Sequence, residues 1–241
     1  MRKVKIGNLN IGEKPILLCT VLEEDVELTV ESAKKAFENG ADCIELRIDK
    51  LRDNSMIKEI IEKIKGPKLL VCRPKVWDGF FEGTEEERVE RLLIAIEDGA
   101  DAVDVELNTP PDLREKVIEK AKEKRIPVLI AYENFEKTPS NKELLNILKE
   151  EQGLGADIAK FAVIAKNYSD MVRVLQVVLE AKKALDIPFV AIAMGKYGSI
   201  TRPLACVLGS SMTYCAVEKG KEGAPGQLTV EVTRRIMEIL S

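Results

Sequence analysis

Short apolar segments alternate with amphipathic segments along the whole chain. Eight of the apolar segments have the length of a strand: Ile16–Val21, Cys43–Arg47, Lys68–Arg73, Ala102–Glu106, Val128–Tyr132, Ile158–Val163, Phe189–Met194 and Met212–Ala216. Nearly continuous apolar runs of this length are typical of parallel strands that are covered by helices. Helical spacing of apolar positions marks segments between them: Thr29–Asn39, Glu85–Asp98, Asp112–Glu123 and Asp170–Ala184. The pattern therefore predicts an α/β protein.

The joints between helix and strand repeat almost letter for letter. Asn39-Gly40-Ala41-Asp42 returns as Asp98-Gly99-Ala100-Asp101, and Gly155-Ala156-Asp157 is a shorter third copy. Such repetition suits βα units arranged in a ring, so the sequence favours a single (β/α)8 TIM barrel domain over residues 1–241. A doubly wound sheet is the alternative, but no G-x-G-x-x-G or P-loop motif follows any of the strands.

The segment before the first predicted strand alternates apolar and polar residues around a turn. Val4–Ile11 carries this turn signal at Gly7-Asn8 and predicts an N-terminal β-hairpin. We expect the hairpin to plug the lower end of the barrel.

Composition limits the partners. The net charge is −4, from 41 acidic and 37 basic residues. No block of Lys and Arg stands free of interspersed Glu, which speaks against nucleic acid as a partner. A local cationic pocket for a small anion is compatible with this balance. The apolar runs are too short to cross a bilayer, and the first residues lack a signal-peptide pattern, so we expect a cytoplasmic protein with no membrane partner.

Two residue types restrict the chemistry. The chain contains no histidine, so the commonest general acid or base and the commonest metal ligand are both missing. Its cysteines are odd in number, widely spaced and without a CxxC motif: Cys19, Cys43, Cys72, Cys206 and Cys215. We expect buried reduced thiols, and neither disulfides nor a zinc site.

Polar residues at the ends of the apolar strands are the candidates for chemistry, because barrel enzymes act at the C-terminal ends of their strands. They are Glu45, Arg47, Arg73, Glu106, Glu133, Lys160 and Arg202. Lys160 is the only charged residue in its strand. Burial and nearby arginines would both disfavour its ammonium form, which predicts a free amine able to attack a carbonyl. The alternative is a buried ion pair or a side chain that reaches the surface.

Arginines at the same rim indicate the kind of substrate. Arg47, Arg73 and Arg202 could each bind a carboxylate through two parallel hydrogen bonds, which suits a small anionic carbonyl compound. The alternative is that they form ion pairs with Glu45, Glu106 or carboxylates of the helices.

The rim segments together resemble type I 3-dehydroquinate dehydratase, the Schiff-base enzyme of the shikimate pathway. The resemblance follows the order of the chain: Glu45-Leu46-Arg47-Ile48-Asp49, Arg73 with Glu82-Gly83-Thr84-Glu85-Glu86, Gly99–Leu107, Asn134-Phe135-Glu136-Lys137-Thr138-Pro139, Gly155–Lys160, Met194-Gly195-Lys196 and Ala224-Pro225-Gly226-Gln227. Each motif is common, but the ordered set is specific to this family.

The resemblance implies roles for these residues. Lys160 would form an imine with the C3 ketone of 3-dehydroquinate, and Arg202 would hold the substrate carboxylate. The imine acidifies the C2–H, a base removes that proton, the C1 hydroxyl leaves as water, and hydrolysis releases 3-dehydroshikimate. No metal or organic cofactor is implied, and the family's members are usually homodimers. The substrate hydroxyls and the lid would be held by Glu45, Arg47, Arg73 and Gln227.

Three positions depart from the family's pattern. Glu133 stands where the family has its acid/base histidine, Asp78 aligns with the glutamate that orients that histidine, and Gly223 replaces a serine. In one interpretation, Glu133 is the replacement base: Asp78 and an apolar wall would raise its pKa, while the arginines nearby would lower it. In the other, the protein is a diverged imine-forming lyase for a related oxo-acid, or a binding protein that keeps the pocket. The retained substrate-binding residues favour the first.

Overall fold

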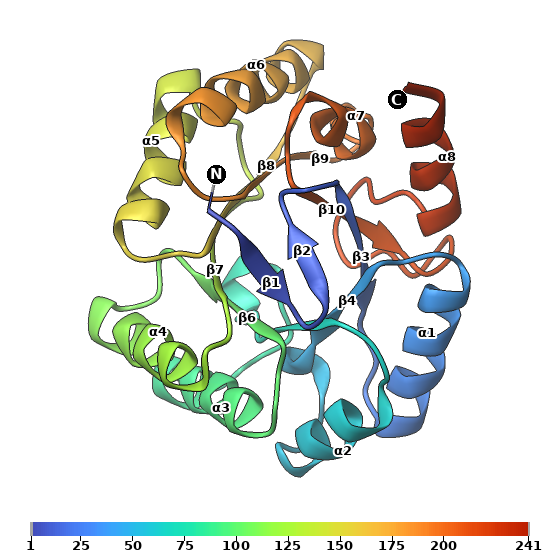
Figure 1. Ribbon diagram of the computed structural model, residues 1–241, viewed down its shortest axis with the longest axis vertical. Coiled ribbons are helices and arrows are strands. Elements are labelled where there is room, and N and C mark those ends of the chain that lie inside the picture. Colours follow the sequence, from blue (N-terminus) through green and yellow to red (C-terminus); the bar gives the residue numbers. More distant parts are fainter. Residues whose placement is uncertain (1, 241) are drawn as a thin grey trace.

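A computed structural model describes residues 2–240, and its centre is a barrel of eight parallel strands (Figure 1). In chain order they are β3 (Ile16–Val21), β4 (Cys43–Arg47), β5 (Lys68–Val71), β6 (Ala102–Glu106), β7 (Val128–Asn134), β8 (Ile158–Ile164), β9 (Phe189–Met194) and β10 (Met212–Ala216). Each strand from β3 to β8 pairs with the next strand of the chain, and β10 pairs with β3, which leaves a seam between β9 and β10. The remaining seam is bridged by Ser211 N, which donates to Phe189 O at 2.8 Å. The predicted TIM barrel is confirmed.

Helices surround the barrel (Figure 1). They are α1 (Val26–Glu38), α2 (Ser55–Lys63), α3 (Glu85–Glu97), α4 (Pro111–Lys124), α5 (Asn141–Gly153), α6 (Tyr168–Ala184), α7 (Thr201–Leu208) and α8 (Val230–Leu240), with short 3₁₀ turns η1 (Ile48–Lys50) and η2 (Lys75–Trp77). Local signals explain where several begin. Thr84 and Ser140 each open a capping box, and Asp25 accepts the N–H of Leu28.

Alternation along each strand divides the interior into two layers. On β8, Phe161 and Val163 face outward and pack under the helices, while Ile158 and Ala162 face the lumen. Because the period is two, Lys160 must share the inner face with Ile158 and Ala162. The five cysteines are free and buried, as predicted. Among the described residues, no helix has the length and apolarity needed to cross a bilayer.

The predicted hairpin is present as β1 (Val4–Ile6) and β2 (Leu9–Ile11), and it lies across one end of the barrel (Figure 1). Ile6 and Ile11 are buried and belong to the same apolar cluster as the inward-facing Leu18. The hairpin therefore closes the N-terminal end of the strands, and polar chemistry is left to the opposite end.

This packing predicts a stability difference within one strand. Ile6→Ala should lower the free energy of unfolding by about 2–5 kcal/mol, because it opens a cavity beneath the barrel. Lys5→Ala, on the exposed face of the same strand, should change it by less than about 0.5 kcal/mol. Chemical denaturation of both variants measures the difference. Equal effects would show that the hairpin does not contribute to the core.

Candidate active site

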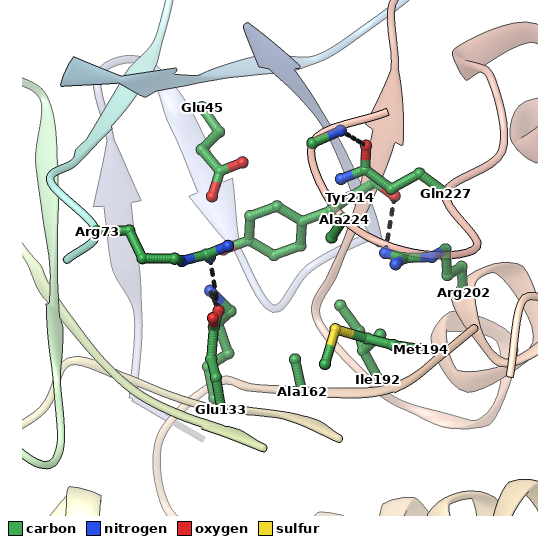
Figure 2. A pocket seen from close by; sticks show the side chains of 12 residues that line it. Glu45, Arg73, Glu133, Ala162, Ile192, Met194, Arg202, Tyr214, Ala224 and Gln227 are labelled. Atoms are coloured by element: carbon green, nitrogen blue, oxygen red, sulfur yellow. Dashed lines mark hydrogen bonds and ion pairs between the residues drawn. The ribbon is translucent and has the colours of Figure 1, made fainter. Parts of the chain in front are cut away.

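A cavity lies at the C-terminal ends of the strands (Figure 2). It is lined by Glu45, Arg73, Glu133, Lys160, Ala162, Ile192, Met194, Arg202, Tyr214, Gly223, Ala224 and Gln227. Five of the rim residues singled out from the sequence meet here with Gln227. Glu45, Glu133 and Lys160 lie at inward positions of strands, Arg73 follows β5, and Arg202 lies on α7.

Lys160 is the buried centre of this cavity. Its Nζ atom lies 3.0 Å from Asp104 Oδ2 and 3.2 Å from Glu133 Oε1, and its side chain is 3% exposed. The ammonium also lies 4.7 Å from the centre of the Tyr214 ring. From the outer layer, Glu151 of α5 accepts the backbone N–H of Lys160 at 2.8 Å, which fixes this part of β8.

The charge state of Lys160 differs from the prediction. Burial disfavours the ammonium, but Asp104, Tyr214 and Glu133 outweigh burial and raise the pKa of Lys160 well above its ordinary value. The expected free amine is therefore wrong: Lys160 is a cation paired with carboxylates. The sequence pattern indicated arginines as its neighbours, and the carboxylate of Asp104 was not expected there.

Glu133 connects Lys160 to Arg73. Its Oε1 atom accepts a hydrogen bond from Arg73 Nη2 at 2.7 Å, and its side chain is 5% exposed. Burial acts to raise the pKa of Glu133, but the Arg73 and Lys160 cations together lower it below the ordinary value. Of the two opposing influences expected from the sequence, the cations therefore prevail, and Glu133 is ionised. Its Oε2 atom is buried with no hydrogen-bond partner.

Asp104 is the site residue that the sequence analysis missed. It lies on β6 two residues before Glu106, so it projects to the same inner face. Burial raises its pKa, an effect that the Lys160 ammonium opposes. The signal was an acidic residue at an inward position of an apolar strand, in the motif Asp104-Val105-Glu106.

Arg202 differs from the other two arginines. It donates to three backbone carbonyls, Tyr214 O, Pro225 O and Gly226 O, at 3.0–3.2 Å. Burial lowers its pKa to about 10, and within residues 2–240 no carboxylate forms an ion pair with it. Arg73 by contrast is paired with Glu133. Arg202 is therefore the arginine whose charge a substrate carboxylate could neutralise.

Arg47 does not line the cavity. Its Nε and Nη2 atoms donate to the two carboxylate oxygens of Asp49 at 2.8 and 2.7 Å. Asp49 also accepts the N–H of Phe80 at 3.1 Å, and Arg47 Nη1 donates to Gly223 O at 3.5 Å. Arg47 thus ties two of the loops around the cavity together.

A chain of hydrogen bonds joins Glu45 to the last loop. Gln227 Nε2 donates to Thr20 Oγ1 at 3.0 Å, and this hydroxyl donates to Glu45 Oε2 at 2.6 Å. Gly223 N donates to Gln227 Oε1 at 2.8 Å. A Cβ atom on Gly223 would lie only 2.3 Å from the Thr20 methyl group. The glycine that replaces the family's serine therefore fits the close approach of Thr20.

Besides Arg47, two more of the predicted site residues, Asp78 and Glu106, lie outside the cavity. Asp78 is exposed at the end of η2, in a left-handed conformation, so the structure does not bring it to Glu133. Its expected role beside the base is wrong for this conformation. Glu106 accepts from Arg88 Nη1 at 2.8 Å. Burial raises the pKa of Glu106 to about 7, against the effect of Arg88.

Buried polar atoms without hydrogen-bond partners gather at this site. In the part of the chain that the structure describes, they include Glu45 Oε1, Arg73 Nε, Asp104 Oδ1, Glu133 Oε2 and Tyr214 OH. Buried polar groups normally have partners, so such a concentration marks the place where a polar ligand would be bound. A lysine with carboxylates to accept its proton, beside an unpaired arginine, is equipped for covalent chemistry on an anionic carbonyl compound.

Comparison with known proteins agrees with this geometry. The family model described as type I 3-dehydroquinase matches residues 18–241. The 3-dehydroquinate dehydratase of Methanosarcina barkeri is 37% identical over 98% of this chain and 99% of its own length. That of Methanothermobacter thermautotrophicus is 37% identical over 90% and 93%.

A solved structure gives the same result for the fold. The type I 3-dehydroquinate dehydratase from Clostridium difficile, with covalent modified comenic acid, superposes with a TM-score of 0.93 and 27% identity, covering 99% of this chain and 98% of that one. The chain belongs to the type I 3-dehydroquinase family.

Proposed function

We propose that this protein dehydrates 3-dehydroquinate to 3-dehydroshikimate through an imine on Lys160, as a hydro-lyase of the shikimate pathway. The observation that carries the proposal is the placement of Lys160 Nζ, buried within 3.2 Å of two carboxylates in a cavity that also holds the unpaired Arg202. The names of the full-length relatives, 3-dehydroquinate dehydratase, support the same reaction. A homodimer, which the family resemblance implies, is part of this proposal.

Lys160 must lose a proton before it can attack the ketone. Asp104 is the acceptor best placed for this, because its Oδ2 atom is 3.0 Å from Nζ. Burial raises the pKa of Asp104, so the carboxylate is a better proton acceptor than one in water. Transfer within the pair converts two buried charges into a neutral amine and a neutral acid. The amine can then form the carbinolamine and the imine.

Glu133 then serves as the base at C2, in the position where the resemblance places a histidine. Its Oε1 atom is held by Arg73 and Lys160, while its Oε2 atom is free to accept a proton. When the C2 proton leaves, the imine nitrogen changes from a cation to a neutral enamine. One of the two cations that lower the pKa of Glu133 is thereby lost, so the carboxyl becomes a stronger base as the proton is transferred.

The return of this charge would drive the second half of the reaction. Departure of the C1 hydroxyl restores the cationic imine, which makes protonated Glu133 a stronger acid at the moment when the leaving group needs a proton. A carboxylate coupled to the nitrogen in this way does not need a resting pKa near 7. Because of this coupling, Glu133 can act as the base although two cations lower its pKa in the resting site.

The substrate carboxylate is assigned to Arg202, since that arginine is anchored by carbonyls and has no carboxylate partner among the described residues. The substrate hydroxyls are assigned to Glu45, Arg73 and Gln227. Each of these lines the cavity, and Glu45 Oε1 and Arg73 Nε are both without partners. Arg47 contributes by holding the loops that carry Asp49, Phe80 and Gly223.

The covalent step can be tested by trapping. Incubation with 3-dehydroquinate and borohydride should add the mass of the reduced ligand at Lys160, as read by peptide mass spectrometry. Lys160→Arg should give no adduct, because a guanidinium does not form an imine under these conditions. An adduct only with a different oxo-acid would favour a diverged lyase. The absence of any adduct in the wild type would favour a binding protein.

The assignment of Asp104 as the proton acceptor for Lys160 can be tested without substrate. Asp104→Asn removes the neighbour that does most to raise the pKa of Lys160, so that pKa should fall. Reductive methylation with formaldehyde, followed by mass spectrometry across pH, gives the pH at which half of Lys160 reacts. This midpoint should move to lower pH in Asp104→Asn. It should stay in place in the control Asp101→Asn, which removes only the partner of Lys68. An unmoved midpoint in Asp104→Asn would contradict the assignment.

The base can be tested by replacing its carboxylate. Glu133→Gln should slow turnover by roughly 10²- to 10⁴-fold, the usual contribution of a general acid or base. The imine should still form, so the variant should accumulate the trapped adduct. Glu133→His restores the family's residue and should keep or raise activity. If Glu133 only holds Arg73, Glu133→Gln would raise KM and leave kcat nearly unchanged, and the base would have to be reassigned.

A further inference from the structure

Tyr214 forms part of the cavity beneath the reactive nitrogen. It lies at an inward position of β10, is 3% exposed, and lies among the inner apolar cluster. Lys160 Nζ is 4.7 Å from the centre of its ring, which makes a cation–π contact. Figure 2 shows the ring lying across the cavity between the Ala224 and Arg73 side chains.

The hydroxyl of Tyr214 is buried without a hydrogen-bond partner. A buried hydroxyl without a partner destabilises the fold, and phenylalanine would fill the same space without that cost. Stability therefore does not explain the hydroxyl. Its position is also specific, because the charges that act on its titration are those of the site: Lys160, Glu45, Asp104 and Glu133.

Among the residues that line the cavity, Tyr214 carries a neutral donor without a partner; Asp104, which takes the proton of Lys160, is not part of this lining. Gln227 is engaged at both its amide nitrogen and its oxygen, and Glu133 is held ionised by two cations. Burial raises the pKa of Tyr214 well above its ordinary value, so the phenol carries its proton at any working pH. Formation of the imine requires such a proton, because the carbinolamine oxygen leaves as water rather than as hydroxide.

We propose that Tyr214 is a catalytic residue. Its hydroxyl gives its proton to the hydroxyl oxygen of the carbinolamine that the substrate ketone forms with Lys160. This inference rests on the proposed imine mechanism. In the step, the C–O bond breaks and takes its electron pair to oxygen, the phenol O–H proton joins that oxygen, and water departs. The nitrogen lone pair forms the C=N bond, which leaves an iminium cation beside a phenolate.

The resulting charges favour this arrangement. The iminium lies over a ring that has become anionic, so the existing cation–π contact of Lys160 becomes a direct charge interaction. The carboxylic acid formed on Asp104 when it took the proton of Lys160 then returns that proton to the phenolate, which restores the phenol and the carboxylate. By microscopic reversibility the same steps run backwards in hydrolysis of the product imine: the Asp104 carboxylate takes the phenol proton, and the phenolate accepts a proton from the attacking water. Tyr214 thus acts at both ends of the cycle, and Glu133 acts between them.

The test is Tyr214→Phe, which keeps the ring, the packing and the cation–π contact and removes only the hydroxyl. The initial rate of borohydride-trapped imine formation, measured by rapid quench with 3-dehydroquinate, should fall by at least about 10²-fold. Turnover should fall in parallel. The melting temperature should stay the same or rise, because an unpartnered hydroxyl is removed. The matched control is Tyr168→Phe on the exposed start of α6, which should trap at the wild-type rate.

The possible outcomes separate this inference from the function it rests on. If Tyr214→Phe forms the imine as fast as the wild type, the ring is only a wall of the cavity and the catalytic assignment falls, while the role of Lys160 stands. If imine formation is normal and only later turnover is slow, the hydroxyl acts elsewhere and the carbinolamine step is wrong. If the wild type itself gives no adduct, the imine mechanism fails and this inference fails with it.

Discussion

The ion pair of Lys160 with Asp104 and Glu133 is the interaction around which the rest of the site is organised. A cation in the barrel lumen is costly unless it is paired, and both carboxylates lie within 3.2 Å of its nitrogen. Each carboxylate is in turn set by its own surroundings: Glu133 by Arg73, and Asp104 mainly by burial. Two buried carboxylates thus share one ammonium but differ in how readily they take up a proton. In the proposed mechanism, that difference allows Asp104 to free the amine while Glu133 remains ionised for a later step.

The barrel makes such a cluster possible because alternate residues of every strand point to the lumen. Apolar residues fill that lumen at its lower levels, where the hairpin seals the N-terminal end, and the charged residues Asp104, Glu133 and Lys160 each follow at least one apolar inward residue of their strand. The polar atoms are consequently concentrated at one depth, enclosed by packed strands and covered by the loop of Gly223 and Gln227. The loop is itself held from below, since Arg202 donates to Pro225 O and Gly226 O. A cation available for the substrate therefore also fixes the loop that covers the substrate.

Much of this architecture could be predicted from the sequence, because strand length, helix spacing and Gly or Pro joints are local signals. The bounds of β3, β4, β6, β9 and β10 agree with the sequence pattern, and β5 ends two residues early, since the chain turns toward Pro74 after Val71. The site was predicted less well because pairing is not local. Arg73 pairs with Glu133, Lys160 pairs with Asp104, and Asp78 lies at the surface. The missed Asp104, together with Tyr214 and Glu133, reversed the expected charge of Lys160, because these three groups outweigh burial and the nearby Arg73.

A glutamate that acts as the base, the role we propose for Glu133, has to obtain its acid and base strength in another way than a histidine does. A histidine titrates near neutral pH by itself, whereas Glu133 between two cations is a weak base at rest. Its strength has to come from the reaction, through loss and recovery of the positive charge on the nitrogen of Lys160. Such a base needs to be close to that nitrogen, and the 3.2 Å contact meets this requirement. It also cannot supply a proton while both cations are present, as they are before the imine forms. In the proposed mechanism, an uncharged donor gives the proton for loss of water from the carbinolamine. Tyr214 suits this role, because its hydroxyl has no partner among the described residues and its ring contacts the nitrogen of Lys160.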